Sequence, residues 1–562
     1  MDKPPSVWQR GTMRRPLSDL PLLTPPSALG LILGALCFVA SLTPSLIPRA
    51  GLVQGVLAGA CFAAGYAIGM LAVMVWRLFG LPLPAGKAAT AAWRWSAVLA
   101  AAGIVWGLSR VTGWQDALHR AMDLPAVESA RPLVIAVVSA VVAGALIFLG
   151  RLFRRSMMVV AGRLTRIMPE RLALLVGFAV AVLLFNFVGN DLIVRWSFTA
   201  FDASYRAVDA AIPAETAPPA DPLKTGSAAS LIPWQGLGAE GRNRVLDPLD
   251  AAAIAAIAGA PAKEPLRIYA GLGSADGPRA LAKLALDEAI RVGAFDRGTL
   301  VIATPTGTGW MDPAAMLPLE VLTRGDVATI SVQYSYLPSW LALLADPDYG
   351  AETARAVFAE IHGYWHGLPA EHRPKLYLFG LSLGSLNSDL SADFYDMIAD
   401  PYQGALWVGP PFASRSWAEI TAGRVAGTPA WLPRFRDGSV VRFMNQTEMP
   451  DAGLKWGPLR IVYLQYASDP IVFFAPSTLW REPDWMRAPR GPDVIPQFRW
   501  LPVVTLLQLG FDVITATTTP AGHGHVYAGG DYLRAWQALL SPEGWDEAGL
   551  ARLRAALAAR GL

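Results

Sequence analysis

Residues 375–385 have the sequence Lys-Leu-Tyr-Leu-Phe-Gly-Leu-Ser-Leu-Gly-Ser, and this stretch decides the fold. An apolar run suited to a buried strand ends at Gly380, the serine follows at Ser382, and helix-like sequence begins after Gly384. This is the Gly-x-Ser-x-Gly pattern of a nucleophile elbow, in which a sharp turn between strand and helix exposes the serine hydroxyl. Because the chain has 52 glycines in 562 residues, so short a pattern can arise by chance, and the rest of the chain must supply its catalytic partners.

The composition indicates that part of the chain lies in lipid. Apolar residues make up 53% of the chain and charged residues 16%, and the mean hydropathy is +0.36, whereas soluble domains carry about 25% charged residues. The formal net charge of +3 gives no argument for nucleic acid as a partner. Both cysteines, Cys37 and Cys61, lie in the apolar N-terminal half, so the second half can form neither a disulfide nor a thiolate metal site.

Five long apolar stretches follow a polar, proline-rich tail over residues 1–26. Each is near the length that crosses a hydrocarbon core, although Arg94 interrupts the third. They predict an α-helical transmembrane bundle of about five spans within residues 27–195. The stretches are Ala28–Ile47, Leu52–Trp76, Ala91–Leu108, Leu133–Leu149 and Leu172–Ile193.

The basic residues predict the orientation of this bundle. The N-terminal tail carries Lys3, Arg10, Arg14 and Arg15, and the region between the fourth and fifth stretches, residues 150–171, holds six arginines. Basic loops stay on the cytoplasmic side, so we expect a cytoplasmic N-terminus and, after five spans, an extracytoplasmic C-terminal half. A miscount of one span would invert this expectation.

The second half has the pattern of alternating strands and helices. Residues 196–262 include a proline-rich stretch and are predicted to be a linker, and residues 263–562 are predicted to form the catalytic domain. Strands that alternate with helices favour a mostly parallel, doubly wound sheet. The expected strands are Leu266–Ala270, Thr299–Thr304, Ala328–Gln333, Lys375–Phe379, Ala405–Val408, Leu459–Gln465 and Phe511–Ala516.

An activated serine needs a histidine as base and an acid to orient that histidine. With an elbow of this kind, the acid and then the histidine follow the serine along the chain. Only His523 and His525 come after Ser382, and His525 is favoured because the Val-Tyr that follows it fits an exit into the last helix. Asp469 ends the preceding predicted strand and is the expected acid. Asp512 is its main rival.

The oxyanion hole requires backbone N–H groups that face the developing negative charge. Leu383, the residue after the serine, should supply one. The glycine-containing loop after Thr299–Thr304 should supply the other, from Gly307 or Thr308, and the segment Gly271–Ser274 is a weaker rival. The Gly307 loop lacks the lysine of a phosphate-binding P-loop.

Two further features have alternative interpretations. Long insertions at 409–457 and 471–510 are expected to be caps, and the aromatic residues of the second could line an acyl pocket, meet the membrane interface or lie in a core. His362 and His366 are one helical turn apart, a spacing that metals use, but no third ligand is evident. We expect neither a metal nor an organic cofactor.

Several blocks of the chain resemble a bacterial family of membrane-anchored α/β-hydrolases that was long described only as a domain of unknown function. The resemblance implies an N-terminal multi-span domain and a C-terminal serine-hydrolase domain in a bacterial inner (plasma) membrane, and it implies no particular substrate. The blocks are residues 41–49 (Ser-Leu-Thr-Pro-Ser-Leu-Ile-Pro-Arg), Thr304–Trp310, Gln333–Trp340, Phe379–Gly384 and Gly522–Tyr527.

The resulting expectation is a serine hydrolase that cleaves an ester or related acyl bond of a hydrophobic or lipid-like substrate, with the lipid bilayer as its partner. Ser382, Asp469 and His525 (or His523) would form the triad. An acyltransferase with the same triad is one alternative. Another is a membrane transport or assembly module with a degenerate hydrolase domain. The sequence does not predict the oligomeric state.

Overall fold

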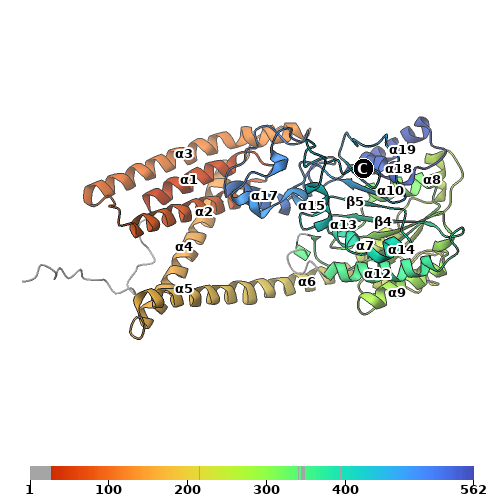
Figure 1. The fold of residues 1–562 in the computed structure, drawn as a ribbon, viewed down its shortest axis with the longest axis horizontal. Coiled ribbons are helices and arrows are strands. Elements are labelled where there is room, and N and C mark those ends of the chain that lie inside the picture. Colours follow the sequence, from red (N-terminus) through yellow and green to blue (C-terminus); the bar gives the residue numbers. More distant parts are fainter. Residues whose placement is uncertain (1–26, 214–215, 340, 343–348, 393) are drawn as a thin grey trace, which may run out of the picture. The chain divides into compact units, whose positions relative to one another are not determined.

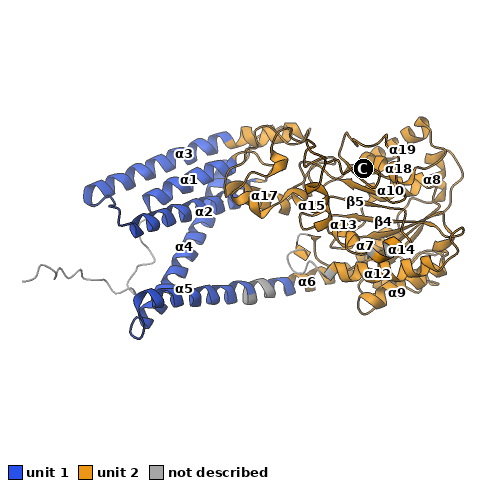
Figure 2. Ribbon diagram, in the orientation of Figure 1, with its two compact units in different colours: residues 1–42, 51–110, 131–200 blue, residues 43–50, 111–130, 201–562 orange. Residues whose placement is uncertain are grey.

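The computed structural model describes residues 27–213, 216–339, 341–342, 349–392 and 394–562. It divides into two compact units (Figure 2). The first contains residues 1–42, 51–110 and 131–200, and the second contains residues 43–50, 111–130 and 201–562. Two loops of the N-terminal half therefore belong to the same unit as the C-terminal half.

The regular structure in the described part of the first unit is all helical, with short loops between the helices (Figure 1). Four of its helices, including the segment Glu170–Asn190, are long and apolar enough to cross a membrane, and α1 is a shorter apolar helix of 15 residues. Each of the five predicted apolar stretches coincides with one of these helices, but α1 ends at Leu42 and not at Ile47. The helices are α1 (Ala28–Leu42), α2 (Gly51–Leu78), α3 (Gly86–Ala121), α4 (Pro132–Leu164) and α5 (Glu170–Asn186).

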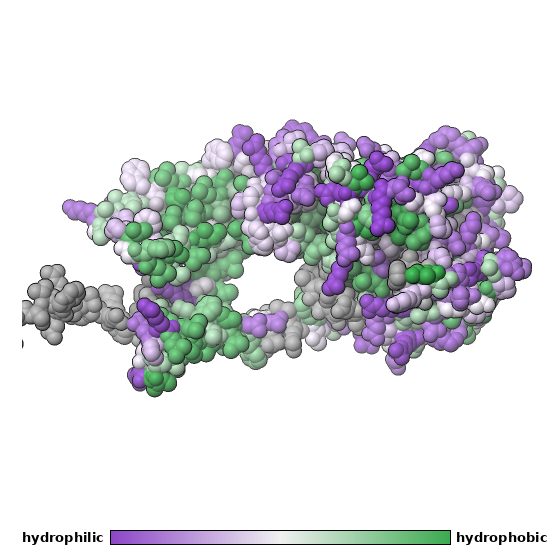
Figure 3. Space-filling model, in the orientation of Figure 1, coloured by the Kyte–Doolittle hydropathy of each residue, from purple (hydrophilic) through white to green (hydrophobic). Residues whose placement is uncertain are grey.

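The surface of these helices is hydrophobic, as Figure 3 shows in green. On α4, for example, Leu133, Val137 and Val141 are exposed at a spacing of four residues. Within the unit, the helices approach closely at small residues, because a Cβ on Gly59 of α2 would lie 2.8 Å from the Ser139 carbonyl oxygen of α4. Close contact at glycine between apolar helices is typical of membrane bundles.

The second unit contains a seven-stranded sheet in the order β1-β3-β2-β4-β5-β7-β6, in which all six pairings are parallel. Parallel strands are covered by helices on both faces and are therefore almost wholly apolar. The strands are β1 (Leu266–Ala270), β2 (Thr299–Thr304), β3 (Val327–Val332), β4 (Lys375–Leu381), β5 (Gly404–Val408), β6 (Val441–Met444) and β7 (Arg460–Leu464).

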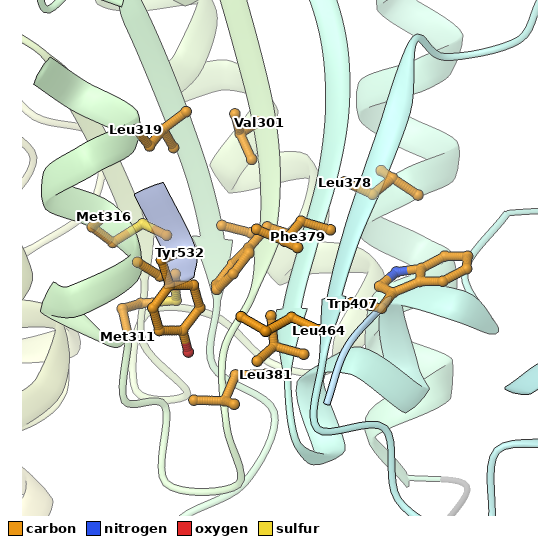
Figure 4. Close-up of a cluster of buried hydrophobic side chains, with 14 of the residues drawn as sticks. Val301, Met311, Met316, Leu319, Leu378, Phe379, Leu381, Trp407, Leu464 and Tyr532 are labelled. Carbon is orange, nitrogen blue, oxygen red and sulfur yellow. The ribbon is translucent and has the colours of Figure 1, made fainter. Parts of the chain in front are cut away.

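Two groups of helices cover the two faces of the sheet (Figure 1). One group contains α10, α18 and α19, and the other contains α9 and α12, while α13 follows β4 directly. Figure 4 shows the core on the first face, where Phe379 of β4 lies near Val301 of β2, Met316 of α10 and Tyr532 of α18. The helices of the unit, beyond the end of α3, are α6 (Arg195–Ala210, from residue 201), α7 (Gly238–Val245), α8 (Ala251–Ala258), α9 (Pro278–Arg291), α10 (Pro313–Leu322), α12 (Tyr349–His366), α13 (Leu383–Asp389), α14 (Phe394–Ala399), α15 (Arg415–Ala422), α16 (Pro470–Phe473), α17 (Val504–Ile514), α18 (Gly529–Leu540) and α19 (Glu547–Ala559).

The structure corrects one predicted strand. Residues 511–514 belong to helix α17, whose buried positions, Val504, Thr505, Gln508, Leu509 and Asp512, recur at helical spacing. A short apolar run does not distinguish a strand from a buried helix, and this one was too short to show the helical period. The seventh strand is instead β6, which lies inside the first predicted cap insertion.

The predicted linker over residues 196–262 also contains regular structure. It includes most of α6 and all of α7 and α8. Helix α8 has local start and stop signals, because Asp250 caps its first turn by accepting a hydrogen bond from Ala253 N–H, and Gly259 ends it with a φ of 69°.

Candidate active site

The turn between β4 and α13 places Ser382 in a strained conformation. Its φ is 58° and its ψ is −128°, values that a residue with a side chain adopts only when the surroundings impose them. The Ser382 N–H donates to the Val408 carbonyl oxygen at the end of β5, at 2.9 Å. A Cβ on Gly384 would lie 2.4 Å from the carbonyl oxygen of Thr304, so only glycine lets the helix start this close to β2.

Asp469 and His525 form a buried pair at the same edge of the sheet. The Asp469 Oδ2 atom lies 2.7 Å from His525 Nδ1, and both side chains are almost fully buried. Asp469 follows β7 and caps α16, where its Oδ1 accepts the N–H of Ile471. His525 lies in the loop between α17 and α18 and is fixed by its own N–H, which donates to the Ala516 carbonyl oxygen.

Tyr527 gives Asp469 a further hydrogen bond that the sequence did not suggest. Its hydroxyl donates to Asp469 Oδ2 at 2.6 Å. Burial, and next the negative charge of Asp469, raise the pKa of Tyr527 well above its usual value, so the phenol stays protonated and remains a donor. Asp469 thus accepts hydrogen bonds from the Tyr527 hydroxyl and the Ile471 N–H in addition to its contact with His525 Nδ1.

The other nitrogen of His525 is available for a substrate-side role. Nε2 is buried and has no hydrogen-bond partner among the described residues. The ring lies against Gly409, where a Cβ would be 2.6 Å from His525 Cε1. Gly409 follows Val408, which holds the backbone of Ser382. The end of β5 therefore brings the histidine ring to the elbow.

The two rival residues are placed elsewhere. Asp469 is bonded to His525, and no hydrogen bond joins it to His523 in the described part of the chain. Asp512 lies on α17, where it forms a buried ion pair with Arg49 at 2.8 Å. Its carboxylate also accepts hydrogen bonds from the Ser45 hydroxyl and from the Leu46 N–H. The Asp512 carboxylate therefore binds the 43–50 loop and does not orient a histidine.

The loop after β2 meets the elbow, as the strand order predicted, because β2 and β4 are neighbours in the sheet. Three side chains hold this loop. Ser339 Oγ accepts the Gly307 N–H at 3.0 Å, Gln333 Nε2 donates to the Thr308 carbonyl oxygen at 3.0 Å, and Tyr269 donates to the Gly309 carbonyl oxygen at 2.8 Å.

These contacts distinguish between the N–H groups of Gly307 and Thr308, the two predicted oxyanion donors of this loop. The Gly307 N–H is used by Ser339, and the Gly309 N–H donates to the Thr306 carbonyl oxygen. The Thr308 N–H has no hydrogen-bond partner among the described residues. Leu383, as the first residue of α13, also has an N–H without a helical partner. The weaker rival is engaged, since the Leu272 N–H donates to Gln333 Oε1.

Residues of both insertions contact the loop that carries His525, either directly or through Ser468. Asp493 Oδ2 accepts hydrogen bonds from the Ser468 hydroxyl at 2.6 Å and from Gln446 Nε2 at 2.8 Å. Ser468 Oγ in turn accepts the Gly524 N–H, and Gln446 donates to the Gly522 carbonyl oxygen.

The aromatic residues of the second insertion have different surroundings. Phe473 and Trp485 lie in the core with ring centroids 5.5 Å apart, whereas Trp480 is 67% exposed. At least part of the predicted cap therefore packs into the core of the domain.

A second buried carboxyl lies near His525. Asp312 follows the loop after β2, accepts the N–H of Ala314 at 2.9 Å and the hydroxyl of Tyr532 at 3.0 Å, and interacts electrostatically with His525. Burial raises the pKa of Asp312 to about 6, despite the opposing effect of these hydrogen bonds.

The pair of histidines on α12 has a structural environment. His362 Nε2 lies 3.0 Å from the Asp400 carbonyl oxygen, and His366 Nδ1 lies 2.7 Å from Asp400 Oδ2. Arg373 also pairs with the Asp400 carboxylate. Within the described residues, no group of three or more histidines, cysteines or acidic residues could hold a metal ion.

Sequence spacing could not have found the residues that support this site. Tyr527, Gln446 and Asp493 reach it from separate loops. Gln333, Ser339 and Tyr527 do lie inside the blocks Gln333–Trp340 and Gly522–Tyr527, which carried the family resemblance.

Comparison with known proteins agrees with this fold. A family model described as "Alpha/beta-hydrolase family" matches residues 266–553, and a second, described as "Alpha/beta-hydrolase family N-terminus", matches residues 42–247. Neither the curated proteins nor the solved structures include a significant match. The N-terminal match begins at the last residue of α1 and includes α2 to α5.

Proposed function

Since the chain belongs to the alpha/beta-hydrolase family, as the resemblance predicted, we propose that it is a membrane-anchored serine hydrolase that cleaves an ester or related acyl bond. One observation carries the proposal. A buried Asp469–His525 pair presents an unpartnered Nε2 at the same sheet edge as a serine in a strained elbow. A serine becomes a nucleophile when such a base removes its proton.

The reaction follows from these positions. Ser382 Oγ bonds to the carbonyl carbon of the substrate while its proton moves to His525 Nε2. The carbonyl oxygen becomes an oxyanion, which the N–H groups of Leu383 and Thr308 stabilise by hydrogen bonds. When the tetrahedral intermediate collapses, the bond to the leaving alcohol breaks and His525 returns the proton to that alcohol. Water then attacks the acyl-enzyme by the same route, and a carboxylic acid is released.

Asp469 has a supporting role in both halves of this cycle. Its hydrogen bond to Nδ1 keeps the proton on that nitrogen, so that Nε2 is the basic atom, and its charge stabilises the imidazolium that forms. The Tyr527 hydroxyl and the Ile471 N–H fix the carboxylate in the orientation that this requires. No metal is needed for any step.

The helical unit supports the anchoring part of the proposal. Four helices are long and apolar enough to cross a membrane. From residues 43–50, two such helices lead to residues 111–130, and two more lead to residue 201. An even number of crossings returns the chain to the same side, and these three segments do belong to one unit. This argument holds whether or not α1 crosses.

The basic residues then favour an extracytoplasmic catalytic domain. The loops on the other side of the candidate spans are residues 79–85 and 165–169. Six arginines lie within residues 151–171, around the second of these loops. By the positive-inside rule this end is cytoplasmic, so residues 43–50, 111–130 and the catalytic domain would face the opposite side.

Ester hydrolysis in detergent tests the function directly. We expect purified protein to hydrolyse short p-nitrophenyl esters and Ser382→Ala to abolish this activity. Ser385→Ala is the matched control, because Ser385 is a buried serine on α13, three residues after Ser382. Equal activity of wild type and Ser382→Ala would contradict the proposal. Adding a competing alcohol and analysing the products distinguishes hydrolysis from acyl transfer.

A further inference from the structure

A cavity adjoins the elbow on its β1–β3 side. Its volume is about 460 Å³, and it lies between α6, α9, α12 and Leu383, the first residue of α13. Leu383 is one of the two N–H groups assigned above to the oxyanion. A group bound at the elbow therefore has this cavity next to it, and its volume is within the range of small-molecule sites, roughly 300–1,000 Å³.

Apolar, polar and charged residues all line the cavity. Apolar side chains of Leu272, Leu281 and Leu337 contribute to the wall with Leu383. The charged residues Asp202, Arg206 and Asp276 also line the cavity, and all three are exposed. A lining that combines apolar side chains with exposed charged groups matches a ligand that is itself amphiphilic.

Two of the three charged lining residues, Asp202 and Arg206, lie on α6, which continues a candidate membrane span. The chain is helical without a break from Glu170 to Ala210, through α5, the π-helical segment Phe187–Val194 and α6. Its first part, Glu170–Asn190, is a candidate membrane span. Asp202 and Arg206 are four residues apart on α6, so they lie on one face of the helix, and that face lines the cavity.

The end of α6 is fixed to the catalytic unit by specific contacts. Asp209 Oδ1 accepts the N–H of Ala239 at the start of α7, at 3.0 Å. Arg242 donates to the carbonyl oxygens of Asp209 and Ala211, at 2.9 and 2.6 Å. These contacts hold the cavity-lining part of α6 within the second unit. The same unbroken helical segment has a candidate membrane span at its N-terminal end.

We propose that this cavity binds the acyl chain of a lipid-like, amphiphilic ester, with the polar part of the ester at the Asp202–Arg206 face of α6. The proposal rests on the serine-hydrolase function and adds the substrate class to it. A long acyl chain gains free energy from each methylene that the apolar side chains of the cavity bury. Long-chain esters should therefore be preferred over acetyl esters.

A chain-length series of p-nitrophenyl esters, from acetyl to palmitoyl, tests the proposal on the full-length protein in detergent. Ala275→Trp places a large ring in the cavity, which Ala275 lines. Ala280→Trp is the matched control, because Ala280 is exposed at the start of α9 and does not line the cavity. We expect Ala275→Trp to lower kcat/KM for long esters about tenfold or more relative to the acetyl ester, and Ala280→Trp to leave the ratio unchanged.

Fluorophosphonate labelling of Ser382 separates the two levels of the argument. If Ala275→Trp is labelled like wild type but has the same chain-length profile, the cavity assignment is refuted and the hydrolase function stands. If wild type itself is not labelled, the function fails. If Ala275→Trp does not fold, Ala275→Leu takes its place, with a smaller loss on the longest esters expected and an unchanged profile again refuting the cavity assignment.

Discussion

Replacing Arg49 with methionine would leave a negative charge buried in the catalytic unit without its cation. Arg49 and Asp512 are both fully buried, and their side chains are joined by two contacts, from the guanidinium Nε at 3.0 Å and from a terminal nitrogen at 2.8 Å. Arg49 belongs to the short loop between α1 and α2, and Asp512 belongs to α17. The ion pair therefore joins the loop between α1 and α2 to α17 within the second unit.

The expected loss of stability follows from the burial of the pair. Removing one partner of a buried ion pair costs about 3–5 kcal/mol, because the remaining charge is left without compensation. Asp512 would keep the hydrogen bonds from the Ser45 hydroxyl and the Leu46 N–H, so we expect the lower end, about 3 kcal/mol. This is a substantial part of a typical free energy of unfolding, about 5–15 kcal/mol.

Urea unfolding in detergent, followed by tryptophan fluorescence, measures this loss. Asp512→Asn removes the buried charge, so the double variant Arg49→Met/Asp512→Asn should be more stable than the sum of the two single losses predicts, by about 1–3 kcal/mol. A loss below about 1 kcal/mol for Arg49→Met, or strictly additive losses, would refute the argument that this pair fixes the loop to the domain.

Four further predictions concern the site and the topology. Asp469→Asn should lower kcat by roughly 10⁴-fold with an intact fold, because the imidazole tautomer is then wrong; circular dichroism with ester kinetics checks this, and a loss below tenfold would count against the triad. Gly309→Ala should lower kcat by about 10²-fold or more, since a Cβ would lie 2.4 Å from the Tyr269 hydroxyl, at a φ of 92°, and would displace the oxyanion loop; unchanged kinetics would exclude that loop from the site. The pKa of Asp312 is raised from 3.8 to about 6 in the folded protein, so ionisation of this carboxyl destabilises the folded state by about 3 kcal/mol once the pH is above both values. The folded state keeps its full stability below about pH 4 and loses this contribution as the pH rises through 6. Wild type should therefore lose more stability than Asp312→Asn between pH 4.5 and 7.5 in urea melts, and parallel pH dependences would contradict the assignment. Reporter fusions should place the C-terminus outside and the loop at residues 79–85 inside, and the same side for both would refute the even-crossing argument.

The sequence predicted most of the sheet because parallel strands carry a strong signal. β4 is apolar throughout its buried length and leads directly into the elbow, so its position and its role as a central strand followed directly. The strand expected at 511–516 was wrong, since six residues, two of them the polar Asp512 and Thr515, are too few to distinguish a strand from a buried helix. β6, with only four residues, lies inside an insertion and gave too short a pattern.

The position of the histidine was predicted through chain order and not through the local structure. His525 lies after a helix and not after a strand, yet the order of serine, acid and histidine still identified a residue that the structure brings to Asp469. Tyr527 and Ser339 could not be assigned their contacts from the sequence, because each partner lies 32 or more residues away along the chain. The role of Arg49 was likewise hidden, since its partner is 463 residues away.

The most direct test of the account is to treat the purified full-length protein with a fluorophosphonate probe and to identify the modified residue by peptide mass spectrometry. We predict a single adduct on Ser382, absent from Ser382→Ala, retained in Ser385→Ala and strongly slowed in His525→Ala. The account would be contradicted if folded wild-type protein carried no adduct, or if the adduct were on another serine.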